Sequence, residues 1–214
     1  MFLDGTAGSG GEAQGDTLQN IEDIIGSNFD DVLIGNEPAN DINGDDGDDE
    51  IGGGNGNDTL RGGNGTDVLV GGAGADDLQG GAAFDIAFYL GSSAVVNVNL
   101  ATGNGFGGEA QGDTFNSVET VIASNFSDIL TGTNAANTFV GRDGSDTLFG
   151  SAGGDILIGG QSAFVDGTGV DTVNYFGQVN EIAVNLTTTR RRGPASVRIS
   201  YSASRMWLAP DWAT

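Results

Sequence analysis

The sequence of 214 residues contains no cysteine, no histidine and no lysine. Without cysteine there is neither a disulfide framework nor a thiolate metal site. Without histidine as well, zinc or haem ligation and a catalytic triad lack their usual residues. No apolar run is long enough to span a membrane. The first residues, MFLDGTAGSGG, have neither a basic region nor an apolar core, so no N-terminal signal peptide is expected.

Positive charge is almost as scarce. Seven arginines face 30 acidic residues, which gives a formal net charge of −23. This balance argues against a nucleic-acid partner, because phosphate binding needs a basic face, and it favours cations as partners. Low hydrophobicity with high net charge is typical of disordered chains. The regular spacing of the apolar residues argues against disorder once that charge is neutralised.

A repeat of nine residues runs without insertion from Gly26 to Phe88, seven times. The blocks are GSNFDDVLI, GNEPANDIN, GDDGDDEIG, GGNGNDTLR, GGNGTDVLV, GGAGADDLQ and GGAAFDIAF. Glycine holds the first place in all seven, an Asp or Asn the sixth, and an apolar residue the eighth. A short fixed period of this kind indicates a solenoid.

A longer repetition lies above the nonapeptides. GEAQGDTLQNIEDIIGSNFDDVLIGN from Gly11 recurs as GEAQGDTFNSVETVIASNFSDILTGT from Gly108. The sequence therefore predicts a first cassette at 1–100 with its array at 26–88, and a second, more degenerate cassette at 101–186 with its array at 123–174. The chain is expected to be a slice of a longer series of such cassettes.

After Leu186 the pattern stops. Residues 187–214 hold five of the seven arginines, both tryptophans and two of the three prolines. We expect this anomalous basic tail to be unstructured or out of frame. The alternative is a genuine basic segment that docks on the acidic repeats or on a partner.

Each nonapeptide is predicted to form half a coil. Its first six residues, rich in Gly and Asp, favour a turn, and its last three alternate so that the eighth side chain points inward. Two nonapeptides, eighteen residues together, complete one coil, which gives an all-β fold, a parallel β-roll or β-solenoid. Longer strands are expected at Val95–Leu100, between the two arrays, and at Ile182–Leu186. Phe29, Phe126, Tyr89 and Tyr175 recur at matched places, which predicts core packing.

Stacked coils would bring equivalent aspartates to about 4.8 Å from one another. Two unpaired carboxylates at that distance repel by about 3 kcal/mol at an effective dielectric constant near 20. A divalent cation between successive turns removes this repulsion. Ligands that are all oxygen, in a flexible loop, select a hard ion and suit calcium over magnesium.

The blocks match the pattern GGxGxDxUx and resemble the RTX, or hemolysin-type, calcium-binding repeats, which form a parallel β-roll. The resemblance implies that a calcium ion lies between turns two nonapeptides apart. One turn would supply the carbonyls of its second and fourth places and the sixth-place Asp; the other would supply its first- and third-place carbonyls and its Asp. Carried over, this gives three sites: Asp45, Gly47 and Asp49 with Gly62, Asn64 and Asp67; Gly54, Gly56 and Asp58 with Gly71, Ala73 and Asp76; Gly63, Gly65 and Asp67 with Gly80, Ala82 and Asp85.

Further pairs are expected to be weaker or looser. They are Asp31 with Asp49, Asn40 with Asp58, Asp128 with Asp146, and Asn137 with Asp155. The irregular stretch 159–165 leaves the place of Asp171 open. Acidic residues outside the sixth place, such as Asp48, Asp77 and Glu50, are expected to be solvated turn carboxylates.

The pattern predicts a calcium-binding module of a secreted bacterial protein that folds on calcium outside the cell. The resemblance implies unfolded export by type I secretion machinery, and open solenoid ends predict self-stacking. No catalytic constellation is expected in this chain. Two alternatives are an accessory module of a larger secreted protease, lipase or alginate epimerase, and a repeat segment of a calcium-rigidified adhesin.

Overall fold

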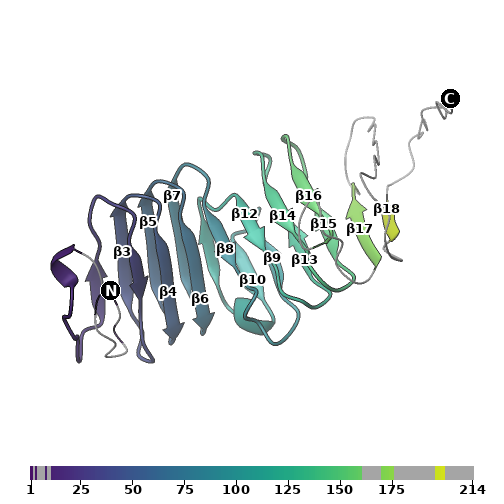
Figure 1. Cartoon of the computed structure of the whole chain (residues 1–214). Helices are drawn as coiled ribbons and strands as arrows, with labels where there is room; N and C mark the ends of the chain where they lie inside the picture. The colour runs from purple at the N-terminus through teal and green to yellow at the C-terminus, as the bar shows by residue number, and fades with distance from the viewer. Residues whose placement is uncertain (2, 4–7, 9–10, 161–169, 176–195, 201–214) are drawn as a thin grey trace.

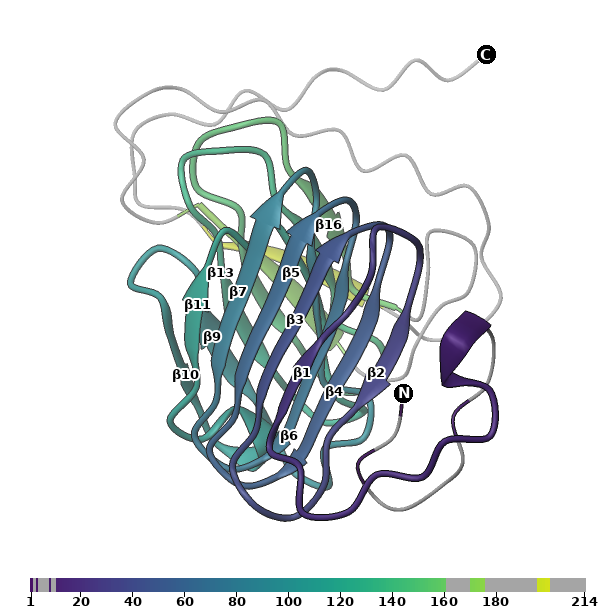
Figure 2. The ribbon, with the colours of Figure 1, turned by 90° about the vertical axis from the view of Figure 1, so that its left-hand side faces the viewer.

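The computed structural model describes residues 1, 3, 8, 11–160, 170–175 and 196–200, and in these the chain winds into a two-sheet roll (Figure 1). One sheet has seven strands in the order β16-β14-β12-β8-β6-β4-β2, and the other has eleven in the order β1-β3-β5-β7-β11-β10-β9-β13-β15-β17-β18. Seen from the N-terminal end, β1, β3, β5 and β7 form one layer beside β2, β4 and β6 (Figure 2). Successive nonapeptides therefore enter the two sheets in turn.

Strand β1 (Asp23–Ile25) precedes the first array, and each of the seven nonapeptides then supplies one strand. They are β2 (Val32–Ile34), β3 (Asp41–Asp46), β4 (Glu50–Asn55), β5 (Thr59–Asn64), β6 (Val68–Ala73), β7 (Asp77–Ala82) and β8 (Ile86–Phe88).

Parallel pairs join strands that lie two nonapeptides apart in this array, as Leu33 with Ile51 and Ile51 with Leu69 show. The eighth-place side chains of both sheets meet in a thin core, where Ile42, Leu60 and Leu78 have no exposed surface. Full burial of one such side chain is worth about 1.5–3 kcal/mol. The predicted all-β parallel solenoid, with two nonapeptides in each coil, is confirmed.

The predicted extent of the turns was wrong for the first array. Strands β3 to β7 each have six residues, because pairing continues through the first three places of the next nonapeptide. Asp45 pairs with Gly63 and Asp46 with Asn64, both in the expected turn. Stacked glycines let the backbones of successive coils stay in register beyond the ninth place, so the turn shrinks to the fourth, fifth and sixth places.

The region between the arrays also differs from its prediction. In place of one longer strand at Val95–Leu100, it contains β9 (Asn97–Asn99), β10 (Asn104–Phe106), the 3-10 turn η2 (Gly108–Ala110) and β11 (Thr114–Asn116). Strand β10 runs antiparallel to both β9 and β11. Gly103 and Gly107, with φ of 69° and 76°, reverse the chain at the two ends of β10. The alternation at 95–100 marks burial on one face, and these reversals end the strand early.

The N-terminal residues repeat part of this junction. A 3-10 turn η1 (Gly11–Ala13) corresponds to η2, and Gly8 N–H donates to Asp16 O as Gly105 N–H donates to Asp113 O. Leu3 N–H donates to Ile34 O as Leu100 N–H donates to Thr131 O. The repetition between cassettes therefore extends from the sequence to the hydrogen bonds.

The second array has shorter strands. They are β13 (Ile129–Thr131), β14 (Thr138–Val140), β15 (Thr147–Phe149), β16 (Ile156–Ile158) and β17 (Val170–Asn174); β12 (Thr120–Ile122) precedes the array and β18 (Ser196–Ser200) follows it.

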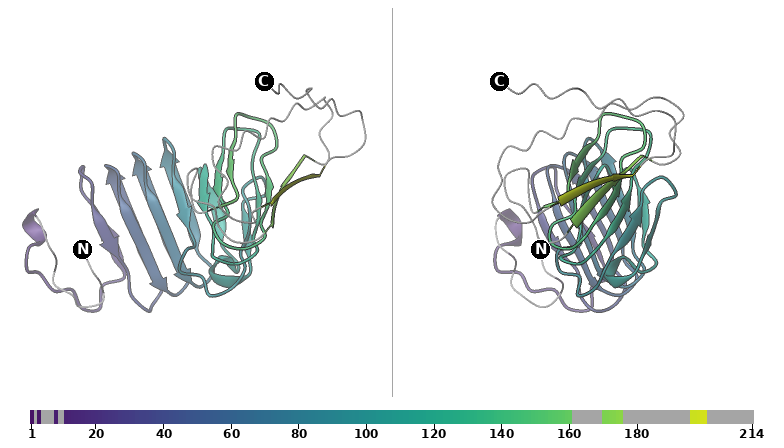
Figure 3. Two further views of the ribbon diagram at one scale, coloured as in Figure 1. Left: turned by 45° about the vertical axis from the view of Figure 1, so that its right-hand side comes forward. Right: turned by 90° about the vertical axis from the view of Figure 1, so that its right-hand side faces the viewer.

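Strand β18 pairs in parallel with β17, at the opposite end of the roll from β1 (Figure 3). It is the part of the predicted tail 187–214 that the structure describes; the rest of the tail and the expected strand Ile182–Leu186 lie outside the described residues. The division into cassettes at 1–100 and 101–186 stays a prediction.

The matched aromatic residues separate into two kinds. Tyr89 is buried, as predicted, and its ring packs edge-on against Phe115 at 6.4 Å between centroids. Phe29 and Phe126 are 77% and 43% exposed, so the prediction of core packing was wrong for them. Both occupy the fourth place of a nonapeptide, which lies on the outside of the turn. Tyr175 is half-buried.

Candidate metal centre

Most sixth-place side chains are buried along both edges of the roll, although they carry a carboxylate in all but two of the turns. Asp49, Asp58, Asp67, Asp76 and Asp85 expose 2% or less of their surface, and so do Asp128 and Asp146 in the second array. Buried carboxylates need partners, since an unpaired ion in the interior costs several kcal/mol. The hydrogen bonds of each carboxylate therefore decide what else the site requires.

One oxygen of each carboxylate is taken by the neighbouring coil. The backbone N–H of Asp49 donates to Oδ1 of Asp67 at 2.9 Å, and that of Asp67 donates to Oδ1 of Asp85 at 2.9 Å. On the other edge, Asp58 N–H donates in the same way to Asp76. We call these two stacks the aspartate ladders; each rung joins the sixth places of turns that lie two nonapeptides apart.

In six of the seven buried aspartates just named, the second oxygen is left without a partner. Buried Oδ2 atoms that accept no hydrogen bond belong to six aspartates: Asp49, Asp58, Asp67, Asp76, Asp85 and Asp146. Orphaned buried acceptors are rare in folded proteins. Six of them in equivalent places indicate a missing positive partner at each rung.

Burial has a direct electrostatic consequence at these rungs. It raises the pKa of Asp49, Asp58 and Asp85 to about 6 and that of Asp146 to about 8, against the opposing effect of the backbone N–H bonds. Neighbouring aspartates add to the shift at Asp49 and Asp146. A bound cation removes this penalty, because it favours the charged carboxylate.

The space beside each orphaned oxygen is bounded by backbone carbonyls. A Cβ on the first-place Gly53 would lie 2.3 Å from Oδ2 of Asp58 and 2.7 Å from the carbonyl oxygen of Gly71 in the next coil. Gly62 stands in the same relation to Asp67 and Gly80, at 2.2 and 2.5 Å. Glycine at the first place thus keeps open a cradle whose walls are a carboxylate oxygen and a carbonyl oxygen.

The predicted partner turns are neighbours in the structure. Fourth-place N–H groups of Gly47, Gly56 and Gly65 donate to the third-place carbonyls of Asn64, Ala73 and Ala82, at 2.9, 2.9 and 3.2 Å. These are the three pairs of turns assigned above from the resemblance. Asp48 and Glu50, outside the sixth place, are exposed as expected for solvated carboxylates.

The donor set fits a hard cation. Among the residues that the structure describes, no three His, Cys, Asp or Glu side chains gather into a metal-binding group. A rung instead offers two carboxylates and the carbonyls of two glycine-rich turns. Such all-oxygen sets with several backbone carbonyls suit Ca²⁺, which accepts six to eight oxygens in flexible geometry.

Two rungs of the ladders lie outside the nonapeptide arrays predicted from the sequence. Asp113 accepts the N–H of Asp76 at 2.9 Å on Oδ1, and Glu119 accepts the N–H of Asp85 at 3.1 Å. GEAQGDTFN, from Gly108, has Gly first, Asp sixth and Phe eighth, so its spacing could have identified Asp113. Glu119 likewise precedes the buried Val121 by two residues. Both continue the ladders across the junction.

Asp171, left open by the sequence, also joins a ladder. Its Oδ1 accepts the N–H of Asp146 at 3.1 Å, although the separation along the chain is longer than the usual two nonapeptides. Gly159 provides the first-place cradle, where a Cβ would lie 2.4 Å from Oδ2 of Asp171. The rung between Asp146 and Asp171 is therefore present despite the longer separation along the chain.

Comparison with protein families agrees with this geometry. The profile of the RTX calcium-binding nonapeptide repeat (4 copies) matches residues 25–60, 52–87 and 119–162, together half of the chain. The chain belongs to the RTX calcium-binding repeat family. The RTX match covers all three predicted pairs of turns and the six aspartates with orphaned oxygens. No curated protein sequence matches the chain.

As an RTX chain, the protein is a calcium-binding β-roll, and its multiple repeats bind several ions. The RTX β-roll is a structural calcium-binding module and not a catalytic fold. No helix among the described residues has the length and apolar character needed to cross a membrane.

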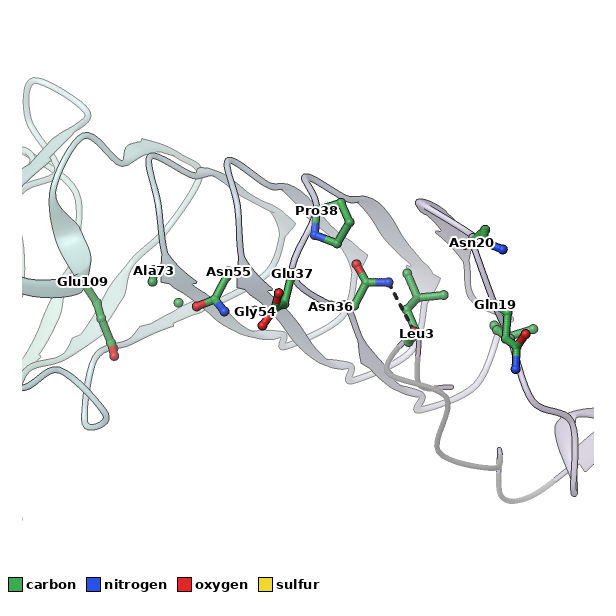
Figure 4. A pocket seen from close by; sticks show the side chains of 12 residues that line it. Leu3, Gln19, Asn20, Asn36, Glu37, Pro38, Gly54, Asn55, Ala73 and Glu109 are labelled. Carbon is green, nitrogen blue, oxygen red and sulfur yellow. Dashed lines mark hydrogen bonds between the residues drawn. The ribbon is translucent and has the colours of Figure 1, made fainter.

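A shallow groove follows one edge of the RTX roll, outside the ladders (Figure 4). Its floor consists of second- and third-place residues of successive turns, including Asn36, Gly54 and Asn55, and it ends near Glu109. Asn36 Nδ2 donates to the carbonyl of Leu3 at 3.2 Å at the other end. No orphaned aspartate lines the groove, but Gly54 and Ala73, from the second predicted pair of turns, do, so the groove borders that pair.

Proposed function

We propose that this RTX roll is a folding module of a secreted protein, which stays loose where calcium is scarce and winds into the roll on binding calcium outside the cell. The observation that carries the proposal is the set of six buried Oδ2 atoms without partners. A roll with these oxygens charged and unpaired is costly, and calcium supplies the missing positive charge at each rung. Binding and folding then become one event.

Three sites are proposed in the first array, each between two turns of neighbouring coils. Each takes the second- and fourth-place carbonyls of one turn, the first- and third-place carbonyls of the other, and both sixth-place carboxylates. The proposed ligands are Asp45, Gly47, Asp49, Gly62, Asn64 and Asp67 for the first site; Gly54, Gly56, Asp58, Gly71, Ala73 and Asp76 for the second; Gly63, Gly65, Asp67, Gly80, Ala82 and Asp85 for the third. In the second array we propose Asp146, whose Oδ2 is also orphaned, and the half-buried Asp155 as ligands of looser sites.

The expected energies are large enough to control folding. Extracellular calcium modules have dissociation constants of about 10⁻⁴–10⁻³ M. At ten times that concentration each site adds about 1.4 kcal/mol to the folded state. Several sites together match the 5–15 kcal/mol stability of a typical domain, to order of magnitude.

Secretion is the finer part of the proposal. RTX repeat proteins are typically secreted, and the low calcium of the cytosol would keep this acidic chain loose until export. Type I secretion machinery is the proposed partner for export. Self-stacking through the ends of the solenoid is proposed as a second interaction, because strand edges at an end of a roll present unpaired backbone groups.

A calcium titration followed by far-UV circular dichroism tests the proposal. The chain, freed of metal with a chelator, is expected to gain β-structure cooperatively as calcium rises to about 10 mM, well above the dissociation constants of extracellular sites. Magnesium at equal concentration is the control and should produce little of this gain, because it demands near-ideal octahedral geometry. A chain whose spectrum stays unchanged over the whole titration would contradict the proposed function.

A further inference from the structure

The eleven turns of the two arrays that the structure describes fall into two classes. In four turns the second-place backbone N–H donates to the sixth-place side chain of the same turn. The donors and acceptors are Ser27 to Asp31 at 2.6 Å, Asn36 to Asn40 at 2.9 Å, Ser124 to Asp128 at 3.0 Å and Thr133 to Asn137 at 2.8 Å. We call these self-capped turns.

Side-chain hydroxyls reinforce three of the four caps. Ser27 Oγ donates to Asp31 Oδ2 at 2.9 Å, and Ser124 Oγ lies 2.9 Å from Asp128 Oδ2. Oδ1 of Asp128 also accepts the N–H of Val96 at 2.8 Å. Both oxygens of this buried carboxylate are therefore satisfied by donors of the chain itself, which stabilises its charged form without a metal.

The remaining seven turns have the opposite backbone conformation at two places. Their second residues have positive φ, at Asp45, Gly54, Gly63, Gly72, Gly81, Arg142 and Ser151, and so do their fourth residues, at Gly47, Gly56, Gly65, Gly74, Ala83, Gly144 and Gly153. We call these open turns. All six orphaned Oδ2 atoms belong to open turns.

Four of these positions hold residues with a side chain, for which positive φ is costly. Asp45, Ala83, Arg142 and Ser151 have φ between 73° and 93°, a conformation that costs about 1–3 kcal/mol and persists at functional sites. The self-capped turns avoid this strain. In three of the four strained turns, those of Asp45, Ala83 and Arg142, the open conformation accompanies an orphaned oxygen.

From this division we propose that the second- and fourth-place residues decide whether a turn binds calcium, and that the first coil of each array, Gly26–Asn43 and Ala123–Val140, is metal-free. The inference rests on the proposed function for the open turns, and it adds which turns bind no calcium. In each metal-free coil the chain's own N–H and hydroxyl groups satisfy the sixth-place side chains, so that the coil provides a strand edge without calcium. The calcium-dependent coils then add to that edge, so each array has a direction.

At the junction between the arrays, the carboxylate of Asp113 is also satisfied by donors of the chain itself. Oδ2 of Asp113 accepts the hydroxyl of the buried Tyr89 at 2.6 Å, while Oδ1 holds the ladder bond from Asp76. The hydroxyl proton of Tyr89 therefore occupies the side of the Asp113 carboxylate that, in the open turns, faces the cradle at the first-place glycine. Asp113 is therefore assigned to the metal-free rungs.

Two stacked aspartates of the second array provide the first test. Asp128 lies in a self-capped turn and Asp146, one coil further, in an open one, and Asp128 N–H donates to Asp146. Asp146→Asn is expected to lower by one the number of calcium ions bound per chain at saturation. Asp128→Asn is expected to leave that number unchanged. Asn already holds the sixth place in two self-capped turns, at Asn40 and Asn137, so the substitution suits the fold.

A reciprocal exchange provides the second test. The turns GSNFDD from Gly26 and GGNGTD from Gly62 share Gly, Asn and Asp at the first, third and sixth places. Ser27→Gly/Phe29→Gly is expected to open the first turn and add one calcium ion. Gly63→Ser/Gly65→Phe is expected to close the second and remove one. Gly154→Ser, where a Cβ meets nothing within 4 Å, is the matched glycine control.

Bound calcium is counted by equilibrium dialysis and elemental analysis, with circular dichroism to show that each variant is folded in saturating calcium. An Asp128→Asn chain that loses an ion overturns the inference, as does a reciprocal pair that leaves the count unchanged. If Gly63→Ser/Gly65→Phe fails to fold, the two Asn variants decide. A wild-type chain that binds no calcium would instead contradict the proposed function, so the two failures are distinguishable.

Discussion

At the scale of the residue, the sixth-place aspartate is a bifunctional group. Oδ1 binds the backbone of one neighbouring coil, and Oδ2 faces the carbonyl of the other. Asn40 and Asn137 bond differently: Oδ1 accepts the second-place N–H of its own turn, and Nδ2 donates to a carbonyl of the neighbouring coil, at Glu22 and Glu119. An Asn brings no charge, and both occur in turns that need no outside partner.

Asp67 is the most demanding test of this dual role, because it belongs to two of the three proposed sites. Asp67→Ala removes a carboxylate from both, and at ten times the dissociation constant the loss of two sites corresponds to about 2–3 kcal/mol. We expect the midpoint of the calcium titration, followed by circular dichroism, to move to clearly higher calcium.

Asp77→Ala is the control for that substitution. Asp77 lies in the seventh place, half-exposed, and accepts bonds from Gln79 and Thr114. Its removal deletes the same charge without touching a ladder. Equal shifts of the midpoint in the two variants would mean that the proposed register of the sites is wrong.

At the scale of the element, the unit of construction is a short strand joined to a glycine turn. Second- and fourth-place glycines of stacked coils approach backbone to backbone: a Cβ on Gly63 would lie 2.0 Å from the carbonyl oxygen of Asp45. The eighth place fills the core, and the turn fixes the spacing of the coils. Neither part is stable without the next coil against which it packs.

Gly65→Ala tests this dependence. Gly65 has φ of 133°, and a Cβ there would lie 1.8 Å from the carbonyl oxygen of Gly47. The strained φ alone costs about 1–3 kcal/mol, and the overlap adds to it. Thermal unfolding in saturating calcium should therefore start at a distinctly lower temperature than in the wild type.

Gly154→Ala is the matched substitution for that measurement, since nothing lies within 4 Å of its Cβ. It is expected to leave the unfolding temperature nearly unchanged. A Gly65→Ala protein that unfolds together with it would show that the stacked turns tolerate side chains.

Sequence spacing predicted the coil and its core because both follow directly from the period. Ile51 and Leu69 had to pair once two nonapeptides make a coil, and they do. The antiparallel strand β10 was missed because it depends on two chain reversals, at Gly103 and Gly107, that interrupt the period. Capping was missed for another reason: the capped turns lack the second- and fourth-place glycines, but that lack does not by itself show that Asp128 accepts a bond from Ser124.

At the scale of the whole molecule, the roll is strongly acidic, and part of its negative charge is buried. Of the net charge of −23, several units lie on buried carboxylates in two parallel ladders. The metal-free roll can relieve this internal charge by taking up protons. Protons and calcium are therefore expected to compete for the same oxygens.

The raised pKa values predict that the stability of the metal-free roll depends on pH. In the metal-free roll the pKa of Asp49, Asp58 and Asp85 is about 6 and that of Asp146 about 8, against an ordinary value of 3.8. Because the folded values are raised, the proton-linked stability is fully present below about pH 4 and is lost as the pH rises through 6 to 8. In a chelator, we expect more β-structure by circular dichroism at pH 5 than at pH 8.

Saturating calcium should reverse that trend, since the ion binds the deprotonated carboxylates. The calcium midpoint is expected to fall as the pH rises from 5 to 8. A metal-free chain with more β-structure at pH 8 than at pH 5 would contradict the assignment of the shifted pKa values to the ladders.

The junction between the arrays also determines the symmetry that relates the two cassettes. Strand β2 follows Asp31 in the seven-stranded sheet, whereas its copy β13 follows Asp128 in the eleven-stranded sheet. The strands inserted between the arrays thus turn the second cassette by half a revolution, and the two are related approximately by a twofold screw. The exposed Phe29 and Phe126 are equivalent in sequence, yet they project from opposite edges of the roll. A feature carried once per cassette is thereby displayed alternately on both sides of the molecule.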